Sequence, residues 1–143
     1  MGRIPSTDFT TRIGSVVLPN PIMTASGTSG QGAELSKYFD LSSLGAIVVK
    51  SLHAKPWPGS PAPRLHPTSA GMINSVGLQG PGIEEWLINE LPALEKAGAR
   101  VIVSIWGQTV EEFEQAAKLL AGTSDAVIAV EVNASCPNLE DRT

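Results

Sequence analysis

The sequence predicts an α/β fold built on a parallel sheet. Short apolar runs rich in β-branched residues are typical of strands that are buried on both faces. These runs alternate with longer stretches whose apolar residues recur at helical spacing, and this alternation indicates βαβ units with right-handed crossovers. The predicted strands cover residues 21–25, 46–50, 101–105 and 126–133.

The longest helical pattern covers residues 82–97. Pro92 lies inside it, so we expect a kink or a new helical turn at that point, because proline lacks the N–H that a helix interior needs. The apolar residues of the pattern fall on one stripe, which indicates a helix packed on the sheet. The stripe consists of Ile83, Trp86, Leu87, Leu91 and Leu94.

A second helix is predicted over residues 109–120. It begins with Thr109 as N-cap and Glu112 three residues later, which is a capping box. A shorter helix is predicted over residues 32–39. The apolar face of the second helix is expected to comprise Val110, Phe113, Ala117 and Leu120.

Two segments do not follow the strand–helix alternation. Residues 9–18 are typical of a β-hairpin that turns at Gly14. Residues 52–82 are rich in proline and glycine and show no periodic pattern, so we expect a long loop without regular structure. Loops of this length inside a compact domain are usually functional.

The number of predicted strands limits the possible architectures. An eight-stranded α/β barrel typically needs roughly 250 residues, and this chain of 143 residues supplies about half of its units. No helical pattern follows the last strand, so two sheet edges would be exposed. The chain is therefore expected to be either a small open α/β domain or the N-terminal half of a barrel.

The composition excludes several classes of function. A net charge of −4, with 10 Lys and Arg against 14 Asp and Glu, provides no basic face for nucleic acid. One cysteine excludes an internal disulfide framework and multi-cysteine zinc sites, and the acidic residues show no metal-ligand pattern. The sequence has no signal-peptide core and no apolar stretch near the roughly 18 residues of a membrane helix. We therefore expect a cytoplasmic protein without membrane, nucleic-acid or metal partners.

Polar residues follow each predicted strand, where the sites of parallel α/β folds lie. Lys50 ends a strand, and it either extends to solvent or directs a cation toward an anionic ligand. Cys136 is either an inert buried thiol or a general base or nucleophile in a loop. Asn74, Asn133 and Asn138 are each ordinary turn residues, but together they suit a planar ligand with imide N–H and C=O groups.

Four sequence motifs carry a resemblance to a known family. They lie at residues 20–28, 45–51, 71–79 and 133–138. In order and spacing the chain is similar to the dihydroorotate dehydrogenases, from about Thr11 onward. Each motif alone is weak, and together they are specific.

This resemblance implies the N-terminal half of a (β/α)8 TIM barrel with an N-terminal β-hairpin. Residues 1–143 would then form part of a single FMN-binding domain that is incomplete at its C-terminus. The implied activity is the oxidation of dihydroorotate to orotate in pyrimidine biosynthesis. A base takes a proton from C5 of the substrate, and hydride passes from C6 to the flavin. The loop at 52–82 would cover the site.

The resemblance also implies roles for individual residues. Cys136 would be the catalytic base, as in class 1 members, whereas class 2 members use serine. Lys50 would contact substrate and flavin, and its charge would favour the reduced flavin. Asn133 would bridge the two. The other implied substrate contacts are Asn74, Ser75, Val76, Gly77, Leu78 and Asn138. The other implied FMN contacts are Ala25, Ser26, Gly27, Ser51 and Ser104.

The motif at residues 69–79 is more similar to class 1B than to the fumarate-using class 1A. Class 1B implies a separate subunit that carries FAD and an iron–sulfur cluster, with NAD as the final acceptor, and a homo-oligomeric assembly. Some positions depart from the family pattern: Ser51-Leu52-His53 replaces Gly-Thr-Thr, Ser104 replaces asparagine, and Trp106 replaces a small residue.

Three alternatives stay open. A related flavin oxidoreductase would act on another dihydropyrimidine. A non-catalytic half-barrel would assemble with another chain through its open edges. An aldolase-like barrel would use Lys50 as a Schiff base, but it would leave the motif around Cys136 unexplained.

Overall fold

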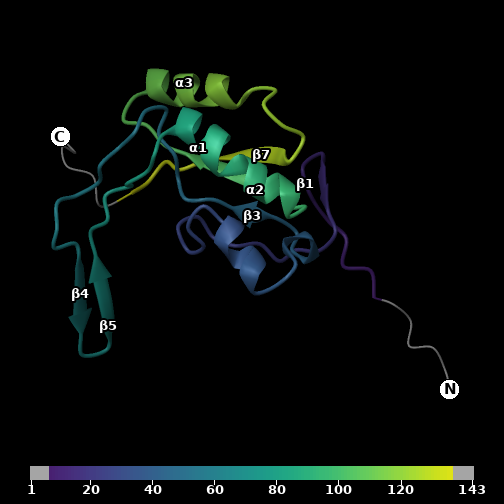
Figure 1. Cartoon of the computed structure of the whole chain (residues 1–143), viewed down its shortest axis with the longest axis horizontal. Coiled ribbons are helices and arrows are strands. Elements are labelled where there is room, and N and C mark those ends of the chain that lie inside the picture. The colour runs from purple at the N-terminus through teal and green to yellow at the C-terminus, as the bar shows by residue number, and fades with distance from the viewer. Residues whose placement is uncertain (1–6, 137–143) are drawn as a thin grey trace.

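The computed structural model describes residues 7–136, and a three-stranded parallel sheet lies at its centre (Figure 1). The strand order is β3-β6-β7, as expected for βαβ units. The strands are β3 (Ile47–Val48), β6 (Val101–Ile105) and β7 (Val127–Val132). Every residue of β6 is buried, whereas the second half of β7 is exposed. The prediction of an α/β fold with a parallel sheet is confirmed. The prediction that every strand is buried on both faces is not confirmed, because part of β7 is exposed.

Three helices cover one face of this sheet (Figure 1). They are α1 (Ile83–Asn89), α2 (Leu91–Lys96) and α3 (Val110–Leu120). The main core forms where Trp86 of α1 and Leu94 of α2, both fully buried, pack against the odd-numbered residues of β6. The helix is interrupted at Glu90, which ends α1 and precedes α2, two residues before Pro92. The expected new helical turn near Pro92 is therefore confirmed. No helix in the described part of the chain is long and apolar enough to span a bilayer.

The helix over 109–120 begins as predicted, but its buried face differs. The Thr109 hydroxyl accepts a hydrogen bond from the Glu112 N–H at 3.3 Å. Val110 is 79% exposed, and Ala116 rather than Ala117 faces the core with Leu120. The expected face was therefore right at residues 113 and 120 and wrong at residues 110 and 117, because the residues that pack against the core are those at 113, 116 and 120.

Two predicted elements are reduced. Residues 21–25 form only an isolated parallel bridge, between Met23 and Ala46. There the Thr24 hydroxyl replaces a backbone ladder, since it accepts from the Val48 N–H at 2.8 Å and donates to the Val48 carbonyl at 3.2 Å. The expected helix over 32–39 is the 3-10 helix η1 (Ala33–Lys37), which buries no side chain and begins after an N-cap glycine with no side-chain cap. A second 3-10 helix, η2 (Leu41–Ser43), follows it.

The expectation of a structureless loop over 52–82 was wrong. This segment contains an antiparallel hairpin of β4 (Leu65–Thr68) and β5 (Gly71–Asn74), which projects from the body of the protein (Figure 1). All eight strand residues are exposed, so neither strand shows the alternation of buried and exposed positions that identifies a strand in sequence. Pro67 in β4 further weakens the signal.

A second antiparallel hairpin precedes the sheet. It joins β1 (Thr11–Ile13) to β2 (Val16–Leu18). The turn passes through Gly14, whose φ of 58° is one that glycine adopts without strain. Leu18 anchors the hairpin, because its side chain is fully buried.

Candidate functional site

A pocket of about 610 Å³ lies at the carboxyl ends of the parallel strands. It brings together segments that are far apart in the sequence: the residues after β3, the end of β7 and the loop before α1. Of the residues that the sequence singled out, six line this pocket. They are Ser26, Lys50, Ser51, Leu78, Asn133 and Cys136.

The Ser51 hydroxyl is the centre of a buried hydrogen-bond network beside the pocket. Its oxygen lies 3.1 Å from the Ser26 hydroxyl and 2.9 Å from the Ser104 hydroxyl, and it accepts from the Asn133 amide at 3.0 Å. A hydroxyl has one donor and two acceptor sites, so these contacts use its full capacity. Ser51 and Ser104 are almost completely buried. The network therefore fixes the side-chain amide of Asn133 relative to β3 and β6.

Lys50 is half-buried and lies against the glycine-rich segment that follows Ala25. A Cβ built on Gly27 would lie 3.3 Å from both Cδ and Nζ of Lys50, and the φ of Gly27 is +81°. The backbone N–H of Lys50 also donates to the Gly30 carbonyl at 3.0 Å. Glycine at position 27 thus allows the lysine side chain to lie along the backbone and to direct its ammonium to the pocket.

The end of β7 supplies the opposite wall. The Asn133 N–H donates to the Ile105 carbonyl at 2.9 Å, and the Asn133 side-chain oxygen accepts from the Ser135 N–H at 3.3 Å. Cys136 is a free, half-buried thiol on this wall. Glu131 also lines the pocket, and sequence analysis missed it. Its position two residues before Asn133, on the same face of a strand, was the available signal.

The remaining predicted contacts lie outside the pocket wall. Asn74 ends the exposed strand β5, and the residues 75–77 continue toward Leu78. Ser104 lies beneath Ser51 with no exposed surface. Ala25 and Gly27 lie on either side of Ser26, which does line the pocket. Asn138 lies outside the described residues.

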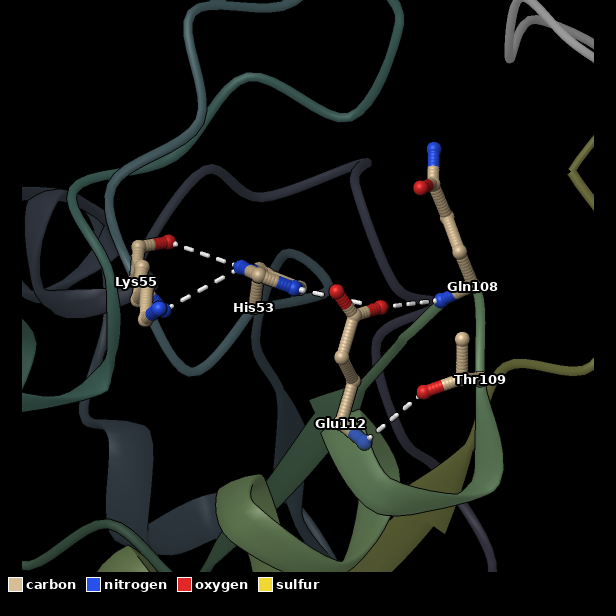
Figure 2. Close-up of polar contacts among 5 residues, drawn as sticks. All are labelled: His53, Lys55, Gln108, Thr109 and Glu112. Carbon is tan, nitrogen blue, oxygen red and sulfur yellow. Dashed lines mark hydrogen bonds and ion pairs between the residues drawn. The ribbon is translucent and has the colours of Figure 1, made fainter.

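A second polar cluster surrounds His53 (Figure 2). Nδ1 of His53 lies 3.1 Å from both the backbone nitrogen and the carbonyl oxygen of Lys55, and Nε2 lies 3.6 Å from the Glu112 carboxylate. Glu112 also accepts from the Gln108 N–H at 2.6 Å. This backbone N–H is the main cause that lowers the pKa of Glu112 below its ordinary value, and His53 adds to the effect.

The His53 ring also belongs to an aromatic cluster. Its centroid lies 4.9 Å from that of Trp106 and 5.9 Å from that of Trp57, and the two tryptophans meet edge to face at 5.2 Å. Sequence analysis noted His53 only as part of a departure from the family pattern. No local pattern reveals the cluster, because Trp106 is remote in sequence from His53 and Trp57. Within residues 7–136, no three His, Cys, Asp or Glu side chains gather as a metal site would require.

Comparisons with known proteins agree with the motifs. A family model described as dihydroorotate dehydrogenase matches residues 9–142. The catalytic subunit of dihydroorotate dehydrogenase B (NAD(+)) from Thermoanaerobacter pseudethanolicus is 51% identical over 128 residues, which are 90% of this chain and 42% of that protein. The protein of the same name from Geobacter sp. strain M21 is 43% identical and covers 93% of this chain and 43% of its own length. The chain thus spans less than half the length of these relatives.

Solved structures show the same fold. The crystal structure of DHODH from Eimeria tenella in complex with ferulenol has a TM-score of 0.67 at 21% identity, and it covers 93% of this chain and 38% of its own. The ligand-free structure of DHODH from the same organism has a TM-score of 0.68, and the match covers 93% of this chain and 40% of that chain.

Proposed function

The chain belongs to the dihydroorotate dehydrogenase family, and on this premise we propose that its pocket is part of a site that oxidises dihydroorotate to orotate. The observation that carries the proposal is the convergence of a cation, an amide and a thiol, from Lys50, Asn133 and Cys136, on one pocket. These three groups come from two separate strand ends. Dihydroorotate is a cyclic carboxylate with imide groups, and it needs a positive charge, a donor–acceptor amide and a base.

The residues around the pocket fit FMN. A volume of about 610 Å³ is sufficient for a flat heterocycle, and the wall offers hydroxyl, amide and ammonium groups for its polar edge. Ser26 and Ser51 would contact the ring, together with the backbone at Ala25 and Gly27. FMN, when bound, supplies a two-electron acceptor for the hydride that leaves the substrate.

The chain's own side chains then have separate tasks. The Cys136 thiolate takes the proton from the substrate carbon, because a thiolate is the basic form of cysteine. The Lys50 ammonium neutralises negative charge on the ligands. Asn133, whose orientation is fixed by Ser51, offers its amide to substrate and cofactor. Ser104 acts from beneath, through its hydrogen bond to Ser51.

We also assign the segment from Asn74 to Leu78 to the substrate, with Asn138 as a further contact. Leu78 reaches the pocket wall directly, and Ser75, Val76 and Gly77 lead to it from the projecting hairpin. Backbone N–H and carbonyl groups in such a turn suit imide recognition.

The architecture and partners belong to the proposal as well. We infer that residues 1–143 correspond to the N-terminal part of a TIM barrel, since the relatives are more than twice as long. The names of those relatives, catalytic subunits with NAD(+) as acceptor, support a class 1B assembly. Its partner would carry FAD and an iron–sulfur cluster, and the catalytic chain would form a homo-oligomer.

The test is a visible absorbance spectrum of the purified protein with FMN, recorded before and after anaerobic addition of dihydroorotate. We expect a retained flavin band that bleaches with substrate. Failure to retain flavin would mean that the half-barrel is incomplete, and the same test would then use a chain of the relatives' full length, whose failure to retain flavin would contradict the cofactor assignment. A band that persists with dihydroorotate but bleaches with another dihydropyrimidine would replace the substrate.

A further inference from the structure

Trp57 is joined to the segment that precedes α1 through both its backbone and its ring. Its N–H donates to the Gly80 carbonyl at 2.9 Å, and the Gly80 N–H donates back to the Trp57 carbonyl at 3.0 Å. The indole N–H donates to the Gly77 carbonyl at 3.0 Å. These contacts hold residues 57–60 and 76–80 side by side as an antiparallel pair.

Glycines bring the two segments into direct backbone contact. A Cβ on Gly77 would lie 2.4 Å from the Ser60 hydroxyl, and a Cβ on Gly59 would lie 2.4 Å from the Val76 carbonyl. Both glycines have positive φ, 72° and 71°. Any larger residue would separate the segments, so the pairing is a close and specific one.

The residue after Gly77 is in an unusual conformation. Leu78 has a φ of +57°, which is rare for a residue with a side chain and persists only where neighbouring structure determines it. Its side chain is 4% exposed and lines the candidate pocket. The hydrogen bond from Trp57 therefore acts on the peptide unit that joins Gly77 to this strained residue.

The Trp57 ring itself is fixed from behind. Trp106, which is 1% exposed, meets it edge to face, and His53 lies against both rings. His53 is in turn held by the Lys55 backbone and faces Glu112 at the start of α3 (Figure 2). The direction of the indole N–H is thus set by the body of the fold rather than by the loop that it binds.

We propose that Trp57 is a positioning residue for the candidate site. Its indole N–H holds the Gly77 carbonyl and so fixes the turn at Gly77 and Leu78 in the form that lines the pocket. Trp57 does not line that pocket and takes no part in proton or hydride transfer. The inference rests on the proposed function, because this turn is where the substrate would bind.

The test removes the N–H and keeps an aromatic ring. Trp57→Phe is compared with Trp86→Phe, a matched control, because Trp86 is fully buried and its ring nitrogen has no hydrogen-bond partner within residues 7–136. For Trp57→Phe we expect about fivefold weaker orotate binding and a matching rise in KM, with kcat changed much less. Amide hydrogen exchange at Gly80 and its neighbours should be faster. Trp86→Phe should change neither orotate binding nor this exchange.

Three outcomes decide between the proposals. Wild-type orotate affinity and wild-type exchange in Trp57→Phe would overturn the positioning role. If the wild-type protein does not bind orotate, the proposed function fails, and the exchange comparison of the two variants still decides the role of Trp57. If Trp57→Phe does not fold, β-(3-benzothienyl)alanine at position 57 replaces the N–H by sulfur in a ring of nearly the same shape, and the same results are required.

Discussion

The side-chain amide of Asn133 donates a hydrogen bond of 3.0 Å to the hydroxyl of Ser51, which lies 82 residues earlier in the chain. The same hydroxyl pairs with Ser104 on β6 at 2.9 Å. One small side chain therefore joins the ends of all three parallel strands. It also determines which face of the Asn133 amide is presented to the pocket.

We predict that Ser51 and Ser104 are energetically coupled. Ser51→Ala should lower the free energy of unfolding by about 1 to 3 kcal/mol, because it leaves the fully buried Ser104 hydroxyl without this partner. Changing both serines to alanine should cost less than the sum of the single changes, by about 1 kcal/mol. Chemical denaturation of the wild type and the three variants measures this coupling. Strict additivity would show that the bond contributes nothing.

We predict that Cys136→Ser slows flavin reduction by roughly 100- to 10,000-fold, the range associated with loss of a general base. The hydroxyl has almost the size of the thiol but is far less acidic, so orotate affinity should change little. Anaerobic stopped-flow mixing with dihydroorotate measures the rate, and titration with orotate measures the affinity. Reduction at the wild-type rate would remove Cys136 from the mechanism.

Lys50 provides a third prediction. Lys50→Met keeps the chain that lies against Gly27 and removes the charge. We expect weaker flavin retention and at least about tenfold weaker orotate binding, because a charge-assisted contact contributes roughly 1.5 kcal/mol or more. Lys37→Met, in the exposed last turn of η1, is the charge-matched control. Equal flavin content and affinity in the two variants would show that the Lys50 charge does not act on the ligands.

The elements that sequence predicts well are those in which burial and local pattern coincide. The strand at β6 is buried at every residue, and α3 begins at the Thr109 cap, so both could be predicted. The β4–β5 hairpin could not, because its residues are exposed on both faces and leave no pattern of buried positions. The strand expected at 21–25 does not form, because the Thr24 hydroxyl hydrogen-bonds to the N–H and the carbonyl of Val48 in place of a backbone partner.

The candidate site divides in the same way. Lys50, Asn133 and Cys136 stand at strand ends, where parallel folds place functional groups, and the structure brings them to one pocket. The supporting contacts have no local signal. Ser51 and Ser104 are 53 residues apart, and Trp57 meets Gly77 across 20 residues, so only the tertiary structure shows these pairs.

The lowered pKa of Glu112 predicts a pH dependence of stability. The carboxylate is favoured in the folded state, mainly by the Gln108 N–H, so its contribution is complete above the ordinary value of 4.5 and is lost as the pH falls through the lowered folded pKa. Relative to Glu112→Gln, the wild type should gain less than about 1 kcal/mol at neutral pH, and this difference should shrink below pH 4.5.

Urea denaturation measures this difference when it is repeated at pH values between pH 3 and pH 7 that are spaced about one pH unit apart. Glu111→Gln removes the same charge from the same helical turn and leaves the bond to Gln108 in place. A wild-type advantage over Glu112→Gln that stays constant across this range would contradict the assignment.

Gly45 tests how the segment before the pocket is attached to the sheet. Its N–H donates to the Ile22 carbonyl at 2.8 Å, and a Cβ at this position would lie 2.2 Å from the Asn20 carbonyl oxygen and 2.9 Å from that of Ile22. Backbone atoms cannot yield as a flexible side chain does, so we expect Gly45→Ala to lower the free energy of unfolding by about 2 kcal/mol or more. The same displacement would move Ser26 and weaken orotate binding.

Gly71→Ala is the matched control, because the nearest atom to its Cβ, the Thr68 hydroxyl oxygen, lies 3.9 Å away. Neither Gly71 nor Gly45 has a positive φ, so an added side chain meets no left-handed backbone strain in either case. We expect a change within about 0.5 kcal/mol for Gly71→Ala. Equal unfolding free energies for the two variants in urea would mean that residues 20–22 are not packed against Gly45. A change at Gly45 would then not be expected to move Ser26 or to weaken orotate binding.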